Sequence, residues 1–296
     1  MTKTVATSKS VTGTKPNPQV HLLEIVPRKR YGQWATAVVL LIFSASLALA
    51  LAQNENIHYA TIAEFFAAEA VLKGLVTTFQ LTAIGMLIGL VVGVLVAVAK
   101  MSENKVLKTL AELYIWIFRG VPLLVQILIL GNFALLFPKL GVGIPFTDIM
   151  FFSVDTNIVI TTFVAGALAL GLHEGAYMAE IVRGGILGVD QGQEEAAIAL
   201  GMTGTLAMGR IILPQAMRII IPPTGNQFIS LLKASSLIAI ISGHDLMSTV
   251  QNISAQSYRT IEMLLVASLW YLIVVTVLNI LQSKLEKRLS RSVRRK

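Results

Sequence analysis

The chain has 296 residues, of which 55% are apolar and 14% are charged. Soluble domains typically carry about 25% charged residues, so this composition favours one membrane-embedded unit over two soluble domains. The chain has no cysteine, which excludes disulfides and thiolate metal sites. Its net charge of +8 is gathered in short segments beside apolar runs. That distribution is typical of cytoplasmic membrane loops and not of a nucleic-acid interface.

The N-terminal segment 1–33 is polar and mostly basic, and it is predicted to be a disordered cytoplasmic tail. Residues 34–52 follow without a charge and are about long enough to span a hydrocarbon core of roughly 30 Å. The Ala48-Leu49-Ala50 end of this run is similar to a signal-peptidase site. However, the run is longer than the roughly 7–15 apolar residues of a signal peptide, which favours an uncleaved helix.

Five more apolar stretches lie at 75–99, 113–137, 157–182, 219–241 and 263–283. Basic residues are frequent in the second and fourth connections and at the C-terminal end, and sparse in the other connections. Such alternation predicts an all-α membrane protein with about six transmembrane helices and both termini in the cytoplasm. Residues 287–296 are then a basic cytoplasmic tail.

The second apolar stretch has glycine at every fourth position, at Gly85, Gly89 and Gly93. This spacing lets two helix backbones approach closely. It favours packing within the chain over contact with a second membrane subunit.

The fifth apolar stretch is interrupted at its start by Pro222 and Pro223 and carries Lys233 near its middle. A central lysine costs roughly 2.5–3.5 kcal/mol, which offsets most of the apolar gain. Neighbouring helices are therefore expected to hold this helix. Lys233 either snorkels to an interface, or it lines a polar path or holds a buried carboxylate.

The fourth connection, Gln191 to Pro214, is unusually long and patterned. The run Glu194–Leu200 favours a short helix with acidic residues at its positive end, and Gly201 suits a left-handed cap. A second short helical run is predicted to end near Pro214. The segment is thus predicted to form a helix–turn–helix knob. Its small alanine faces would fit a groove, and its charged end would orient it.

The same connection resembles the EAA signature of ABC importer permeases. An amphipathic interfacial helix would not require this spacing. The resemblance implies that the loop, including Glu194, docks on an ATP-binding subunit. The matching positions are Glu195, Ala196, Ala197, Gly201, Ile211, Leu213 and Pro214.

Three further segments resemble the polar amino acid permeases, which take up histidine, glutamate, glutamine, arginine and opines. They are Tyr114–Gln126, Gly175–Ile186 and Leu232–Leu237. The resemblance covers a permease core domain at 74–286, so residues 34–52 form an additional N-terminal helix. His173-Glu174, Ala234 and Ser235 depart from the family pattern and leave the substrate open.

The resemblance implies a type I ABC importer permease in the bacterial inner membrane, crossing it several times and surrounded by lipid. Such permeases form homo- or heterodimers, dock an ABC ATP-binding subunit and receive substrate from an extracytoplasmic amino-acid-binding protein. This chain lacks the Gly-x4-Gly-Lys-Ser/Thr phosphate loop. ATP and magnesium are therefore expected on the partner subunit. No enzymatic activity, cofactor or metal site is expected in this chain.

Four residues are candidates for the substrate path: Glu174, Tyr177, Glu180 and Lys233. The acidic groups suit an ammonium group and Lys233 suits a carboxylate. A structural pair of Glu180 with Lys233 is an equal alternative, since buried charges usually pair.

Other functional classes remain as alternatives. An ABC permease for another small solute, such as an opine or methionine, keeps the coupling loop. A secondary transporter predicts inverted repeats, which the sequence does not show. A channel predicts a filter segment or charged ring, and a scaffold predicts neither. None of these last three classes explains the spacing of the EAA signature.

Overall fold

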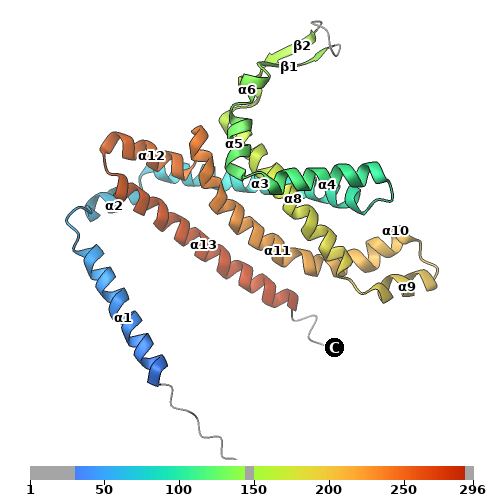
Figure 1. The fold of residues 1–296 in the computed structure, drawn as a ribbon, viewed down its shortest axis with the longest axis horizontal. Helices are drawn as coiled ribbons and strands as arrows, with labels where there is room; N and C mark the ends of the chain where they lie inside the picture. The colour runs from blue at the N-terminus through green and yellow to red at the C-terminus, as the bar shows by residue number, and fades with distance from the viewer. Residues whose placement is uncertain (1–30, 144–149, 291–296) are drawn as a thin grey trace, which may run out of the picture. The chain divides into compact units, whose positions relative to one another are not determined.

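The computed structural model describes residues 31–143 and 150–290 of the chain. These residues are mainly helical, as predicted, and include one two-stranded antiparallel sheet (Figure 1). The chain divides into two compact units, residues 1–55 and 56–296. Most of the predicted tail at 1–33 and the last six residues of the tail at 287–296 lie outside the described residues.

Helices predominate among the elements, which follow one another from α1 to α13. They are α1 (Tyr31–Ala52), α2 (Tyr59–Phe66), α3 (Glu69–Met101), α4 (Lys105–Gly120), α5 (Leu123–Gly131), α6 (Phe133–Leu136), β1 (Lys139–Gly143), β2 (Met150–Asp155), α7 (Thr156–Val159), α8 (Thr162–Leu187), α9 (Gln191–Ala199), α10 (Gly204–Ala207), a π-turn η1 (Met208–Ile212), α11 (Leu213–Ala234), a 3-10 segment η2 (Ser235–Ile241), α12 (Leu246–Ser257) and α13 (Thr260–Ser290).

Within the first unit, helix α1 begins three residues before the predicted start of the run 34–52 and ends where predicted. It is long and apolar enough to cross a membrane by itself. The aromatic and polar residues at its start extend the helix by part of a turn into the predicted tail.

In the second unit, helices α3 and α8 form the central pair, and the glycine stripe of α3 lies between them. A Cβ placed on Gly85, Gly89 or Gly93 would come within 2.9 Å of Leu170, Glu174 or Met178, respectively. The three contacted residues are themselves four apart on α8. The predicted packing within the chain is confirmed, because this close approach has no room for a side chain.

In the second unit, three helical segments and one bent pair of helices are long and apolar enough to cross a membrane. In the described chain these are α3, Gly204–Ile241, Thr260–Leu289, and the pair α4–α5 taken together. Helix α8 occupies the fourth predicted stretch. At 26 residues it is long enough to cross, although it carries glutamates and an arginine.

The predicted third helix, 113–137, is not continuous, which corrects the sequence prediction. Helix α4 ends at Gly120, α5 begins at Leu123, and the chain bends by 99° between them. Pro122 explains the break, since it has no N–H for a helical bond and it forces the preceding residue into extended backbone. Val121 has φ −87° and ψ 131°.

The predicted interruption by Pro222 and Pro223 is also wrong, because α11 runs through both prolines. Gly204–Ile241 is one continuous helical path. Helix α13 supports it at this point. The Gln282 amide donates to the Pro222 carbonyl at 2.8 Å and lies where a side chain on Gly225 would be. In membranes, neighbouring helices commonly stabilise proline-containing helices in this way.

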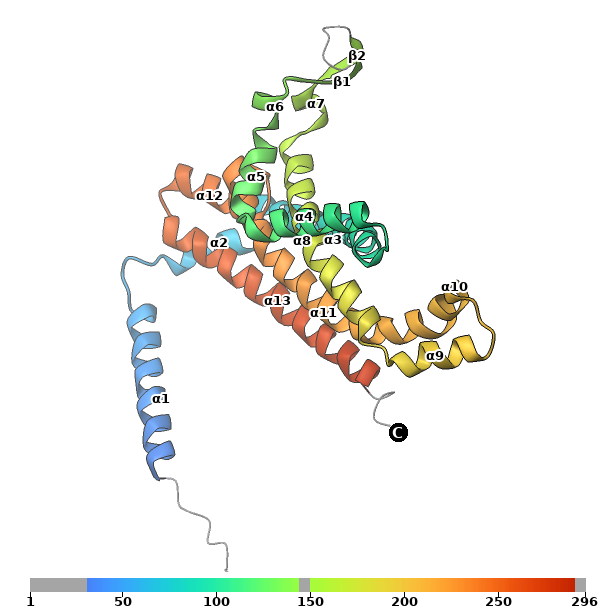
Figure 2. The ribbon, with the colours of Figure 1, turned by 45° about the vertical axis from the view of Figure 1, so that its right-hand side comes forward.

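The connections contain elements that the hydropathy pattern does not reveal. Helix α2 precedes α3, strands β1 and β2 pair between α6 and α7, and α12 precedes α13. Figure 2 shows the hairpin at the α5–α7 end of α8 and the helices α9 and α10 at its other end. Helix α8 therefore connects the two ends of this unit.

Candidate coupling loop and substrate path

The predicted knob is present as α9, a turn, and α10. Helix α9 begins at Gln191, three residues before the predicted start, because the Asp190 carboxylate accepts from the Gly192 N–H at 2.7 Å and caps it. Its C-terminus carries a Schellman motif. The Gly201 N–H donates to the Ile198 carbonyl, and the Met202 N–H donates to the Ala197 carbonyl.

Gly201 adopts the left-handed conformation that the sequence predicts. Its φ is +77°, a region that a side chain disfavours, and a Cβ at this position would meet no atom within 4 Å. Glycine is therefore required here for its backbone conformation, and not because neighbouring atoms leave no room for a side chain. It fixes the direction in which the chain leaves α9.

The alanines of the knob differ in burial, since some lie inside it and others lie on its surface. Helix α9 packs against α10 and the π-turn η1, and Ala197 and Ala207 are buried in the knob. Glu194, Glu195 and Ala196 are exposed. The prediction that small faces enter a partner's groove thus needs a correction, since Ala197 packs inside the knob.

The outer tip of the knob exposes apolar side chains together with its carboxylates. Leu200 is 83% exposed and Ile198 is 56% exposed. An exposed leucine alone is ordinary, but two large apolar side chains on one short capped helix form a surface suited to a partner. The knob therefore offers both charged and apolar contacts.

The second half of the knob does not end near Pro214. Helix α10 passes through η1 into α11, and Pro214 lies in the first turn of α11, directly after the π segment. Ile211 lies in the π-turn and Leu213 begins α11. The Gln215 amide donates to the Gln193 side chain at 3.2 Å and to the Ile211 carbonyl at 3.0 Å. It therefore braces α9 against the π-turn.

The candidate path residue Tyr177 lies beside the bend between α4 and α5. The Arg119 guanidinium lies 5.1 Å from the centre of the Tyr177 ring, within the range of a cation–π contact. On its own helix, Tyr177 lies 5.1 Å from the His173 ring, measured between centroids. The bend thus brings a cation to an aromatic pair of α8.

Gln126 holds the bend in place. Its amide nitrogen donates to the carbonyl of Phe118 at 3.0 Å and to that of Val121 at 2.8 Å. A regular helix would satisfy the Phe118 carbonyl with the N–H of residue 122, which is proline in this chain. The same nitrogen lies 3.1 Å from His173 Nδ1. The two hydrogens of this nitrogen are used by the Phe118 and Val121 carbonyls, so the approach of His173 brings its ring to the bend without fixing its tautomer.

Arg119, Gln126 and His173 were not proposed as path residues from the sequence. The pairing of Pro122 with a polar residue one turn later would have been the signal for Gln126. Nothing in the local sequence indicated that Arg119 would meet Tyr177, because 58 positions separate them.

Glu174 is buried against the glycine stripe of α3. Its side chain is 3% exposed, and the would-be Cβ of Gly89 lies 2.8 Å from its own Cβ. One carboxylate oxygen has no hydrogen-bond partner among the described residues, and the same is true of the Gln126 side-chain oxygen. Buried acceptors without partners are costly and are typical of functional sites.

The remaining two candidates lie apart from this group. Glu180 pairs with Lys100 at 2.5 Å and with Arg183 at 2.8 Å. Lys233 is exposed and forms no ion pair with the described residues. The alternative pair of Glu180 with Lys233 is therefore wrong. Of the four predicted path residues, Tyr177 contacts the bend, and Glu174 lies three positions before it on α8, packed against α3.

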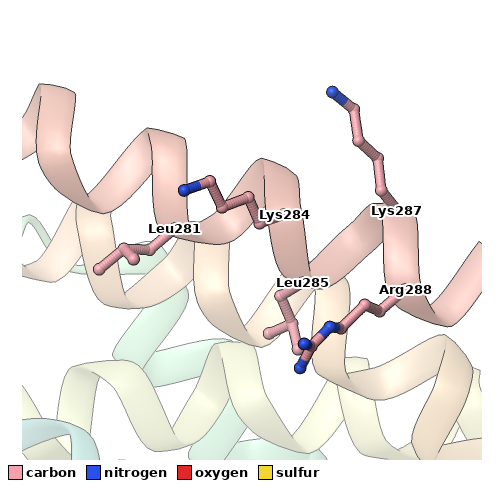
Figure 3. Close-up of a pocket in the computed structure, with 5 residues that line it drawn as sticks. All are labelled: Leu281, Lys284, Leu285, Lys287 and Arg288. Atoms are coloured by element: carbon pink, nitrogen blue, oxygen red, sulfur yellow. The ribbon is translucent and has the colours of Figure 1, made fainter.

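Two of the surface hollows of the second unit differ in the chemistry of their lining. Figure 3 shows one with a volume of about 490 Å³ whose lining comes from α13 alone, including Lys284, Lys287 and Arg288. The cations of this hollow suit the negative end of α13 and continue the predicted basic C-terminal pattern. The second hollow is an apolar groove of about 720 Å³ between α3, α8, η1 and α11.

The fold defines the class of protein. An amino acid ABC transporter crystallised with histidines is similar over 78% of this chain and 99% of its own, with 35% identity and a TM-score of 0.67. A methionine ABC transporter, MetNI, shares the fold at 20% identity and a TM-score of 0.56. The chain has the fold of an ABC transporter membrane subunit.

Sequence comparison then gives the family. Residues 89–291, more than half of the chain, match the binding-protein-dependent transport system inner membrane component. The chain belongs to this family of multi-pass inner-membrane permease subunits.

Two curated relatives represent the similarity at the level of whole chains. The arginine transport system permease protein ArgU of Corynebacterium glutamicum is 39% identical over 90% of this chain and 82% of its own. The putative glutamine transport system permease protein GlnP of Rickettsia bellii is 38% identical over 74% of this chain and 92% of its own. The match to ArgU leaves only about a tenth of this chain uncovered, so the matched region includes part of α1.

Proposed function

We propose that this chain is the membrane subunit of an ATP-driven importer of polar amino acids. It forms the translocation path and couples that path to a separate ATPase through the knob of α9 and α10. The observation that carries the proposal is the knob itself. The knob is a pair of short capped helices that exposes Glu194, Glu195 and Leu200, and local bonds specify its geometry tightly.

The relatives and the bend support the choice of substrate class. Relatives named as arginine and glutamine permeases cover most of this chain. The bend places the Arg119 guanidinium beside the ring of Tyr177, which lies next to the His173 ring, and this cation suits a carboxylate. The unpartnered oxygen of Glu174 suits an ammonium or guanidinium group. Together these groups complement an amino acid with polar ends.

The assembly follows from the proposed coupling. An ABC ATP-binding subunit docks on Glu194, Glu195 and the exposed tip, and it supplies ATP and magnesium. A second permease copy or a sister permease completes the path, and an extracytoplasmic binding protein delivers substrate. Both termini then lie in the cytoplasm, and the core domain 74–286 is preceded by the additional helix α1. Energetically, ATP must bind one conformation of the assembly more tightly than the other.

Reconstitution tests the proposal directly. The chain is purified with its ATP-binding subunit and binding protein, placed in liposomes, and supplied with radiolabelled arginine, glutamine, glutamate or histidine. Uptake that requires ATP, the ATPase and the binding protein is expected for at least one of them. Uptake by the chain alone, driven by an ion gradient, would establish a secondary transporter instead.

Two variants of the knob localise the coupling. Glu195→Lys reverses an exposed charge and is expected to weaken ATPase docking, whereas Lys284→Glu on α13 serves as an exposed charge-reversal control. Co-purification of the ATPase measures docking. Equal retention of the ATPase by both variants would remove the knob from the interface.

Lys233→Met separates a path role from a structural role. Because Lys233 is exposed and pairs with no described carboxylate, the variant is expected to fold and to dock the ATPase normally. Reduced uptake at normal docking supports a place in the path. Normal uptake would exclude Lys233 from it.

A further inference from the structure

The ion cluster of Lys100, Glu180 and Arg183 joins two helices at the end of the unit that carries the knob. Lys100 is the penultimate residue of α3, and its ammonium lies 2.5 Å from one oxygen of Glu180 on α8. The other oxygen accepts from the Arg183 guanidinium through two nitrogens, at 2.8 and 3.0 Å. Glu180 therefore uses both oxygens in charge-assisted bonds.

The position of this cluster along α8 relates it to the knob. Seven residues separate Glu180 from Leu187, the last residue of α8, which is about 10 Å of helix. Asp190, the cap of α9, follows three residues later. The knob continues into α8 through this cap and into α11 through η1, and the cluster is the ionic contact between α8 and α3 in the described chain.

The packing of α3 on α8 changes character toward the cluster. From Gly85 to Gly93 the two backbones are in close contact through the glycine stripe. The apolar groove of about 720 Å³ begins beside this contact, at Leu90 and Val94, and continues past the stripe along Val98 and Met101 of α3 and Ile186 of α8. The groove gives these helix ends room to separate. A partly exposed ion pair opens at a much smaller cost than a packed interface.

We propose that the Lys100–Glu180–Arg183 cluster is a positioning device that makes α3 follow the knob when the ATPase subunit moves it. The proposal rests on the proposed function and assigns Glu180 to coupling in place of the substrate path. Arg183 keeps the Glu180 side chain extended from the α8 surface, so that Lys100 can hold it. None of the three residues needs to contact substrate.

The first test measures amino acid imported per ATP hydrolysed in the reconstituted complex. Lys100→Met and Glu180→Gln are expected to lower this ratio about fivefold or more, the lower end of ordinary coupling free energies, while ATP hydrolysis continues. Lys100→Arg keeps the ion pair and is expected to keep the ratio. Lys105→Met, an exposed lysine beside the cluster in sequence, is the control. A parallel fall of uptake and ATP hydrolysis, or an unchanged ratio, overturns the proposal.

The second test needs no transport and so stands if the proposed substrate class fails. Since the chain has no cysteine, spin labels are placed on Met101→Cys and Leu187→Cys, the exposed last residues of α3 and α8. A single narrow distance distribution is expected with the cluster intact, and a broad or double one with Lys100→Met. Identical distributions overturn the proposal, even if Lys100→Met transports poorly.

Discussion

The knob of α9 and α10 and the bend between α4 and α5 contrast in how the sequence specifies them. Within the knob, Asp190 and Gly201 bond to backbone groups two and three residues away. At the bend, Gln126 and Tyr177 act through residues of other elements, Phe118, His173 and Arg119. One region is specified by local chemistry and the other by contacts between distant segments.

This contrast has a functional counterpart. A locally capped knob keeps its shape while it moves as a unit, which suits the transmission of force. A bend held by side chains from two helices changes shape when those helices shift, which suits a path that opens and closes. Substitutions in each region therefore test whether its shape depends on local bonds or on contacts between segments.

The largest effect on uptake is expected from Gly201→Val in the knob. A β-branched residue at φ +77° costs about 1–2 kcal/mol, which lowers the population of docking-competent knobs about 5–30-fold. Uptake by the reconstituted complex should fall accordingly, while the melting temperature of the isolated chain in detergent stays unchanged. Gly204→Ala, where a Cβ also meets nothing within 4 Å, is the control. A large loss of thermal stability with Gly201→Val would show that the knob is part of the folding core.

Next in size is Gly93→Ala, which tests the α3–α8 interface that supports the bend. The added Cβ would lie 2.5 Å from the Met178 Cβ and 3.1 Å from the Gly175 carbonyl. Such overpacking typically costs about 1–3 kcal/mol. Thermal unfolding in detergent should show the loss. The matched substitution Gly184→Ala on α8 meets nothing within 4 Å and is expected to be neutral or stabilising. Equal effects of the two substitutions would contradict the close approach.

The sequence predicted the helical membrane fold, the glycine stripe and the knob because each depends on periodicity or on local capping. It missed the bend because Pro122 lies within a mostly apolar stretch, and hydropathy does not register a missing N–H. It misplaced the end of the knob because Pro214 acts as a helix starter and not as a terminator. The pairing of Glu180 with Lys100 was beyond local inference, since 80 positions separate the two residues.

A smaller effect is expected from Gln126→Leu, which removes the donor that the bend uses. The carbonyls of Phe118 and Val121 then lose a partner, at a cost of about 1–2 kcal/mol. His173 also loses its contact with the Gln126 side chain. Thermal unfolding should report the first effect, and an increased half-saturating substrate concentration should report the second. Gln215→Leu, which removes an amide from the knob side, should leave that concentration unchanged. A shift with both variants would mean that substrate affinity responds to the knob as well.

The smallest effect is expected from Asp190→Ala. Comparison with Asp190→Asn separates the role of the charge at this position from its role as a helix cap. The Asp190 carboxylate accepts the Gly192 N–H, and loss of an N-cap costs about 1 kcal/mol of local helix stability. Asp190→Asn keeps the acceptor and removes the charge. If the knob requires only the cap, ATPase affinity should fall a few-fold with alanine and stay unchanged with asparagine. If both variants weaken docking equally, Asp190 contacts the ATPase through its charge. The shape of the knob would then depend on more than its own local bonds, and the distinction between the two regions would be one of degree.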